Sequence, residues 1–153
     1  MSLGEKLIAQ HCMLVTAESC TGGALSAAIT SVPGSSQWFD RGFITYSNEA
    51  KIEMLGVNLN TLEAHGAVSE ATAREMILGA FQKSPADIAI SITGIAGPNG
   101  GTKQKPVGTV CFGWGFRNDI QVCTEYFSGT RTSIREQAVE FAVRALHCRL
   151  SDI

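Results

Sequence analysis

Three short segments carry the side chains best suited to chemistry, and each lies where a loop is expected. They are residues 17–23 (AESCTGG), 45–51 (TYSNEAK) and 93–98 (TGIAGP). The first and the third follow the expected strands 13–17 and 87–93, which should be central in a sheet. Ligands of open α/β sheets bind beyond the carboxyl ends of the strands. The sequence therefore predicts one pocket built from these loops.

Ser19 is the candidate nucleophile in the first segment. It precedes Thr21, Gly22 and Gly23, small residues that open an expected helix over 24–29. Exposed amides at such a helix start can stabilise an oxyanion or a phosphate. A serine before a helix is also a common capping residue. On these residues alone capping is the more frequent role, and the nucleophile remains a hypothesis.

The glycine-rich stretch 94–108 is expected to be a loop within the domain. It has neither the G-x-G-x-x-G order of a dinucleotide site nor the G-x-x-x-x-G-K-[ST] order of a phosphate-binding loop. Its backbone could approach a ligand closely and present amides to it. A long connection with residues of positive φ explains the glycines equally well. Lys103 and Lys105 could attract an anion, although loop lysines are commonly just solvated.

Other kinds of site find less support in the sequence. The five cysteines include no C-x-x-C pair, and no metal-ligand set is recognisable. The three histidines do not cluster, and His65 fits a turn better than a catalytic base. Glu18, Glu49 and Glu53 leave a hydrolase with paired carboxylates open, although two of them could simply begin helices.

Composition narrows the class of protein. The chain has 153 residues, 44% of them hydrophobic, and its net charge is −2. This size fits one domain with a sizeable core. No basic stripe suits nucleic acid, and no apolar run approaches the ~20 residues that cross a membrane. Cysteines within apolar runs fit a reducing compartment. We therefore expect a cytoplasmic domain that binds neither nucleic acid nor membranes.

Alternating strands and helices are expected to position the loops. The expected strands, all β-prone, are 13–17, 43–46, 87–93, 107–114 and 120–128. The expected helices are 24–29, 48–55 between Ser47 or Asn48 and Gly56, 70–83 after a cap at Ser69, and a last helix opened by a capping box at 133–136. The last two strands, joined by a polar turn, predict an antiparallel pair. The order predicts a single three-layer α/β/α domain with a mixed, mostly parallel sheet.

Six motifs follow one another along nearly the whole chain. They are AESCTGG at 17–23, PGSS at 33–36, DRGFITYSNEAKIEMLGV at 40–57, HGAVSE at 65–70, TGIAGPNGG at 93–101 and KPVGTV at 105–110. Together they resemble the CinA C-terminal domain family, known for nicotinamide-nucleotide amidase (NMN deamidase) activity and for competence-damage contexts. The resemblance implies one α/β/α amidase domain over residues 1–153. It would hydrolyse the carboxamide of nicotinamide mononucleotide to nicotinic acid mononucleotide and ammonia, within pyridine-nucleotide recycling.

The resemblance also implies roles for single residues. Ser19 would be the nucleophile, Lys51 its partner in a Ser/Lys dyad, and Tyr46 a proton relay or a support for the amine. A lysine base needs a pKa lowered from about 10.4 to roughly 7 or 8, through burial or a neighbouring cation. From their place in the loops and the last helix, our candidate contacts to the oxyanion and the phosphate are Thr21, Gly22, Gly23, Thr93, Gly94, Ala96, Gly97, Arg131 and Arg135. Arginines at a helix start are at least as often simple surface residues.

The same resemblance indicates which cofactors and partners to expect. A Ser/Lys mechanism needs no metal or other cofactor, so none is expected, and the expected partner is a small nucleotide substrate. A homo-oligomer is compatible with the sequence. Two alternatives stay open: a nucleotide-binding regulatory module without turnover, and an amidase that acts on another small amide.

Overall fold

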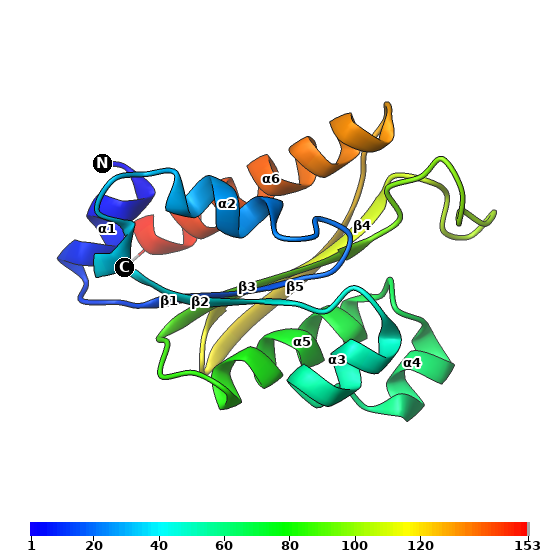
Figure 1. The fold of residues 1–153 in the computed structure, drawn as a ribbon, viewed down its shortest axis with the longest axis horizontal. Helices are drawn as coiled ribbons and strands as arrows, with labels where there is room; N and C mark the ends of the chain where they lie inside the picture. Colours follow the sequence, from blue (N-terminus) through cyan, green and yellow to red (C-terminus); the bar gives the residue numbers. More distant parts are fainter. Residues whose placement is uncertain (153) are drawn as a thin grey trace.

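The chain folds into a five-stranded sheet between two layers of helices (Figure 1). The structure is a computed structural model that describes residues 1–152. In spatial order the strands are β2 (Phe39–Ile44), β1 (Leu14–Glu18), β3 (Ile88–Gly94), β4 (Thr109–Phe116) and β5 (Asp119–Tyr126). No helix within residues 1–152 has both the length and the apolar character needed to cross a membrane.

β1 lies in the middle of the parallel part of the sheet. It runs parallel to both β2 and β3, with Glu18 beside Ile44 on one side and beside Ile92 on the other. β4 is antiparallel to β3 and to β5, so every strand except β4 points the same way. The predicted mixed, mostly parallel sheet and its antiparallel final pair are confirmed.

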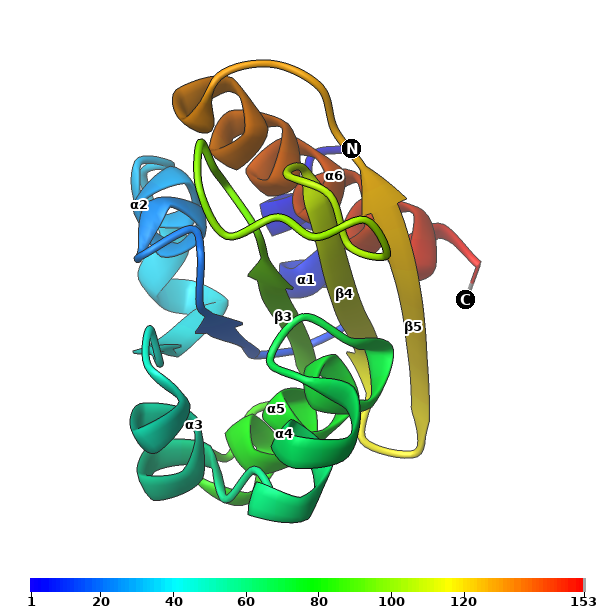
Figure 2. The same cartoon turned by 90° about the vertical axis from the view of Figure 1, so that its right-hand side faces the viewer.

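Helices cover both faces of this sheet. One face carries α1 (Leu3–Ala9), α2 (Ala24–Thr30) and α6 (Arg131–Ser151), and the other carries α3 (Asn48–Leu55), α4 (Leu59–His65) and α5 (Glu70–Gln82) (Figure 1). The chain thus leaves β1 toward one face and the neighbouring β2 toward the other (Figure 2). Such a divergence opens a crevice at the carboxyl ends of the two strands.

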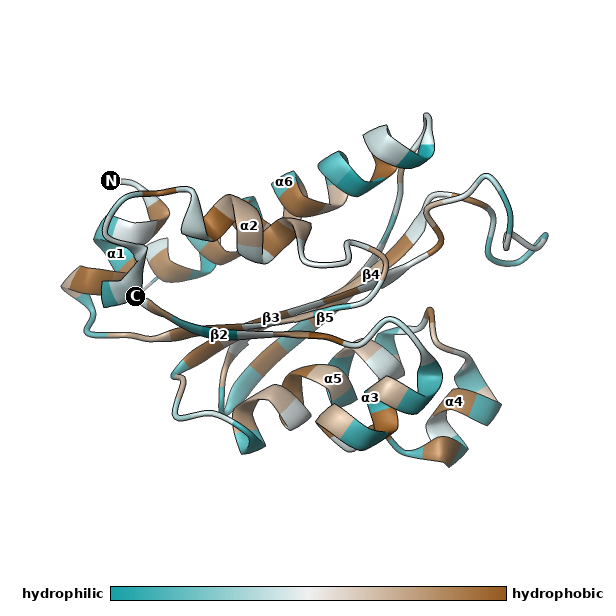
Figure 3. Ribbon diagram, in the orientation of Figure 1, coloured by the Kyte–Doolittle hydropathy of each residue, from teal (hydrophilic) through white to brown (hydrophobic). Residues whose placement is uncertain are grey.

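Each face of the sheet has its own apolar core. Leu14 and Phe112 belong to the core under α2 and α6, and Val15 belongs to the core over α5. Successive side chains of a strand alternate between the two faces. Since both faces are covered by helices, hydrophobic residues occur along the central strands (Figure 3). Because β3 is covered on both faces, Ile88–Thr93 are all buried and its sequence is a nearly continuous apolar run.

The helix α3, which carries the predicted base, is fixed at both ends. Ser47 caps it by accepting a hydrogen bond from Ala50 N at 3.0 Å, and Gly56 ends it in the left-handed region at φ 67°. The predicted cap and stop are both confirmed. Gly79 of α5 lies against the Leu55 carbonyl, where a Cβ would overlap the oxygen, so the two helices pack closely.

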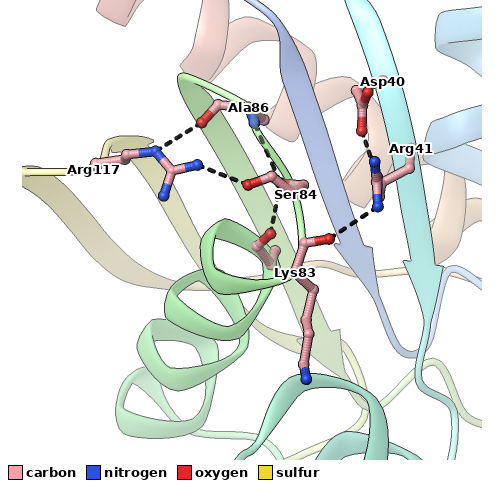
Figure 4. Close-up of polar contacts among 7 residues, drawn as sticks. Asp40, Arg41, Lys83, Ser84, Ala86 and Arg117 are labelled. Carbon is pink, nitrogen blue, oxygen red and sulfur yellow. Dashed lines mark hydrogen bonds and ion pairs between the residues drawn. The ribbon is translucent and has the colours of Figure 1, made fainter.

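At the end of the sheet opposite the crevice, two arginines anchor the connection between α5 and β3. Arg117, in the turn between β4 and β5, donates to the carbonyls of Ser84 and Ala86 at 2.9 Å (Figure 4). Arg41 of β2 donates to the Lys83 carbonyl at 3.0 Å. The residues between α5 and β3 therefore have side-chain partners for carbonyls that the helix end leaves unpaired.

β2 begins earlier than predicted. The strand covers Phe39–Ile44 instead of residues 43–46. Asp40 and Gly42 have little strand propensity. Gly42 nevertheless pairs with Thr16 of β1, and Asp40 lies at an irregularity between the paired residues Phe39 and Arg41. Tertiary pairing therefore decides this boundary.

One helix also begins earlier than predicted, and another helix was not predicted. Thr130 caps α6 by accepting a hydrogen bond from Ser133 N at 3.1 Å, so the helix begins at Arg131 and the capping box predicted at 133–136 is wrong. The helix α4 is absent from the predicted elements, and His65 is its last residue, not part of a turn.

Candidate active site

The carboxyl ends of β2, β1 and β3 surround one cavity of about 280 Å³. Ser19 follows β1, Lys51 lies on α3 after β2, and Gly94 ends β3. The lining residues are Ser19, Cys20, Tyr46, Asn48, Lys51, Ala67, Val68, Thr93, Gly94, Ile95, Ala96, Gly97, Asn99, Gly100 and Arg131. The structure therefore brings all three predicted loops into one wall.

Ser19 and Lys51 contact each other in this wall. Lys51 Nζ lies 2.9 Å from Ser19 Oγ, although the residues are 32 apart in the sequence. The serine is 7% exposed and the lysine 1%. Long side chains on a helix point back toward its N-terminus, so a lysine in the first turns of α3 reaches the ends of the strands. The ends of two adjacent parallel strands thus bring the two side chains together.

Main-chain carbonyls surround the rest of the lysine amine. Nζ lies 2.9 Å from the carbonyl oxygen of Thr45, 3.4 Å from that of Tyr46 and 3.5 Å from that of Ser47. A neutral amine has two N–H donors and one lone pair. In the neutral form the two N–H groups can donate to carbonyls, which leaves the lone pair for Ser19 Oγ. This arrangement suits a base that accepts the serine proton.

Burial lowers the pKa of Lys51 below its usual range, because the charged ammonium loses its hydration. Cys20 acts on this pKa in the opposite direction. Within residues 1–152 the lysine forms no ion pair that would restore its charged form. Burial also raises the pKa of the Cys20 thiol to about 11, so this cysteine stays protonated at neutral pH and does not compete as a nucleophile.

The glutamate before the serine directs its carboxylate into the start of α2. Glu18 is fully buried and accepts hydrogen bonds from the main-chain N–H groups of Gly23, Leu25 and Ser26. Gly23, the N-cap residue at φ 104°, supplies no side-chain cap of its own. These amides are therefore engaged within the chain, and they do not form the anion site predicted at this helix start.

Four of the predicted substrate contacts lie outside the cavity wall: Thr21, Gly22, Gly23 and Arg135. Arg135 Nε donates to the Cys20 carbonyl at 3.1 Å, and its Nη2 donates to the Thr21 carbonyl at 2.9 Å. This arginine therefore holds the turn that bears Ser19. Sequence could not separate it from Arg131, since both open the last helix.

The remaining predicted contacts, Thr93, Gly94, Ala96, Gly97 and Arg131, do line the cavity. Arg131 Nη1 donates to the Gly97 carbonyl at 2.7 Å, and Nη2 donates to Tyr46 Oη at 2.9 Å. The arginine thus connects two of the three loops at the cavity.

Tyr46 lies at the cavity with its side chain 61% exposed. Its hydroxyl contacts Arg131, and only its main-chain carbonyl approaches the lysine amine. The structure gives this hydroxyl no hydrogen bond to Ser19 or Lys51. A role in proton relay stays a prediction.

Several lining residues are absent from the predicted set, among them Asn48, Ala67, Val68 and Asn99. Their side chains carry no distinctive chemistry that would single them out. All four lie within the motifs at 40–57, 65–70 and 93–101 that carry the family resemblance. Membership in those motifs was the one available signal.

An open sheet with a buried serine–lysine pair at its strand ends places this chain in the class of α/β proteins equipped for nucleophilic catalysis. Residues 1–150 match the family model described as the CinA C-terminal domain, and the chain belongs to that family.

Curated relatives and solved structures agree with this assignment. The chain is 50% identical over 145 residues to proteins named nicotinamide-nucleotide amidohydrolase PncC from Shigella flexneri and Escherichia coli K12, covering 94% of this chain and 88% of each relative. A crystal structure of a competence-damaged protein (CinA) superfamily protein from Klebsiella pneumoniae matches with a TM-score of 0.95 and 44% identity. That match covers 99% of this chain and 94% of the other.

Proposed function

We propose that this protein is an amidohydrolase that converts nicotinamide mononucleotide to nicotinic acid mononucleotide and ammonia. The observation that carries the proposal is the buried Ser19–Lys51 pair, with 2.9 Å between Oγ and Nζ, in the wall of a cavity. The named activity of relatives half identical to this chain gives the substrate. All five cysteines are free, which supports a reducing, cytoplasmic compartment.

The first half-reaction forms an acyl-enzyme. Neutral Lys51 accepts the Ser19 proton as Oγ attacks the carboxamide carbon. The C–N bond of the tetrahedral intermediate then breaks, and the lysine ammonium returns the proton to the departing amide nitrogen as ammonia. In the second half-reaction Lys51 activates a water, which hydrolyses the ester and restores the serine hydroxyl.

The tetrahedral intermediate needs donors for its oxyanion. The main-chain N–H groups of Cys20 and Thr21 donate to no main-chain carbonyl within residues 1–152. They belong to the turn that bears Ser19, and Arg135 holds the carbonyls of the same turn. Cys20 lines the cavity and Thr21 does not, so we assign the Cys20 amide to the oxyanion.

Arg131 is our candidate for the substrate phosphate. It is the one arginine in the cavity wall formed by the described residues, and its contacts there are a carbonyl and a phenol, not a carboxylate. Its positive charge is therefore not neutralised by an acidic partner, and a guanidinium binds phosphate well.

The proposal is tested by incubating the purified protein with nicotinamide mononucleotide and measuring both ammonia and the acid product. We expect the two products in equal amounts. Nicotinamide riboside, which lacks the phosphate, is the matched control and should be a poorer substrate because Arg131 has no anion to bind. Binding without turnover would favour the regulatory module, and turnover of the riboside alone would favour another small amide.

Activity is expected to survive chelation. No three His, Cys, Asp or Glu side chains within residues 1–152 lie close enough together to hold a metal ion, and the Ser/Lys chemistry requires none. After EDTA treatment and dialysis, kcat should match that of the untreated protein. Loss of activity that one divalent ion restores would contradict this prediction.

A further inference from the structure

Glu18 satisfies its buried charge within the main chain around the nucleophile. Its carboxylate is 0% exposed and does not line the cavity. Besides three main-chain N–H groups, it accepts hydrogen bonds from Thr21 Oγ1 at 2.6 Å and from Ser26 Oγ at 2.7 Å. Buried charges are expensive unless they are fully hydrogen-bonded, and these five donors meet that requirement.

The position of this cap is unusual for a helix start. A capping side chain ordinarily comes from the N-cap residue itself. Here the N-cap is Gly23, and the acceptor comes from the last residue of β1, five residues earlier. The carboxylate therefore ties the end of the strand to the start of α2, and the intervening turn carries Ser19.

Contacts on both sides of Glu18 extend to the catalytic pair. Within the turn, Thr21 is held by the carboxylate, and its carbonyl is held by Arg135. The main-chain carbonyl of Glu18 accepts a hydrogen bond from Thr45 N at 2.8 Å. The Thr45 carbonyl is in turn 2.9 Å from Lys51 Nζ. Glu18 thus contacts the turn that carries Ser19 through its carboxylate. Through its main-chain carbonyl it contacts Thr45, whose own carbonyl lies beside the lysine amine.

We infer that Glu18 is a positioning residue, whose carboxylate fixes the turn of Ser19 at the distance from Lys51 that proton transfer requires. This inference rests on the proposed function. The competing explanation is that Glu18 only stabilises α2. The two differ in what they predict for kcat, because a cap that acts on stability alone leaves the folded enzyme fully active.

The first test is Glu18→Gln, which keeps the shape of the side chain but turns one acceptor oxygen into a donor facing N–H groups. We expect kcat to fall by about 100-fold with KM changed by less than about threefold, since small displacements of reacting groups have effects of that size. Leu146→Ala is the control, because it truncates a fully buried residue of α6 without touching the turn. It should lower Tm but keep kcat. Equal kcat in Glu18→Gln and wild type would overturn the inference.

A second readout does not depend on the substrate. A fluorophosphonate labels an activated serine, so its rate of reaction with Ser19 reports the geometry of the pair directly. We expect labelling of Glu18→Gln to slow by about as much as kcat. If the wild type labels rapidly but does not turn over nicotinamide mononucleotide, the proposed function fails while this inference stands. Unchanged labelling in Glu18→Gln would contradict the inference alone.

Two milder variants keep the test decisive if Glu18→Gln does not fold. Thr21→Val and Ser26→Ala each remove one hydroxyl from the same carboxylate, but only Thr21 belongs to the turn of the nucleophile. We expect about a tenfold loss of kcat for Thr21→Val and nearly normal kcat for Ser26→Ala. Normal kcat in both variants, with a lowered Tm, would show that the carboxylate acts only through helix stability.

Discussion

Ser19→Ala is expected to lower kcat by about 1,000-fold or more, because removing one member of a cooperating catalytic unit forfeits most of its effect. The hydroxyl is the atom that would attack the carboxamide, and no second nucleophile replaces it. Cys20, the neighbouring candidate, holds its proton because burial raises the pKa of its thiol to about 11. The fold should persist, since alanine fits the space of a buried serine.

Steady-state kinetics and circular dichroism on the same preparations check this result. Ser31→Ala is the matched control, since Ser31 lies at the other end of α2 and its hydroxyl only contacts the Ala28 carbonyl. Mass spectrometry of wild type quenched during turnover should show the acyl adduct on the peptide that contains Ser19. A folded Ser19→Ala protein with near-normal turnover would end the assignment of the nucleophile.

The meeting of Ser19 and Lys51 could be predicted because both follow strands. The run 87–93 indicates a strand buried on both faces, and strands of that kind are parallel and central. Residues placed after neighbouring parallel strands gather at one edge of a sheet. The motif resemblance then supplied the pairing of serine with lysine, which spacing alone does not give.

The assignment of single contacts was harder, because it depends on which backbone groups are already satisfied. Gly22 and Gly23 look like an anion site in the sequence, yet Glu18 occupies the amides at the start of α2. Arg131 and Arg135 are one helical turn apart, and only Arg131 lines the cavity. Residues one turn apart share a helix face, so periodicity does not say which of the two lies beside the cavity.

The missed element and the shifted strand have a common cause. Residues 59–65 form a helix of only two turns, too short for a periodic pattern, and the Asn58 cap is a weak signal. β2 contains Asp40 and Gly42, which disfavour a strand, and it forms because the residues around Asp40 pair with β1. In both places the structure depends on contacts that are distant in sequence.

Lys51→Arg and Lys51→Ala are both expected to lose nearly all activity. The structure places the amine 2.9 Å from Ser19 Oγ and gives it no carboxylate partner within residues 1–152. A base must be able to give up its own proton, and a guanidinium does not do so at accessible pH. Arginine therefore preserves the charge but not the function, and kcat should fall by at least 100-fold, as for other general bases.

The pH dependence follows from the direction of the pKa shift. Burial lowers the pKa of Lys51, and the helix dipole contributes only about 0.3–1 kcal/mol at such a site, so desolvation must supply most of the change. The protonated amine cannot accept the serine proton. Consequently kcat/KM should be low in acid and rise with pH through an apparent pKa below the usual lysine value of about 10.4.

These variants also separate a base from an electrostatic anchor. If Lys51 only held the substrate or the oxyanion through its charge, Lys51→Arg would retain most of the activity, and kcat/KM would fall with rising pH as the ammonium deprotonated. The burial of the amine, which disfavours its charged form, favours the base. Retained activity in the arginine variant would move the search for the base to Tyr46, whose hydroxyl would first have to leave Arg131.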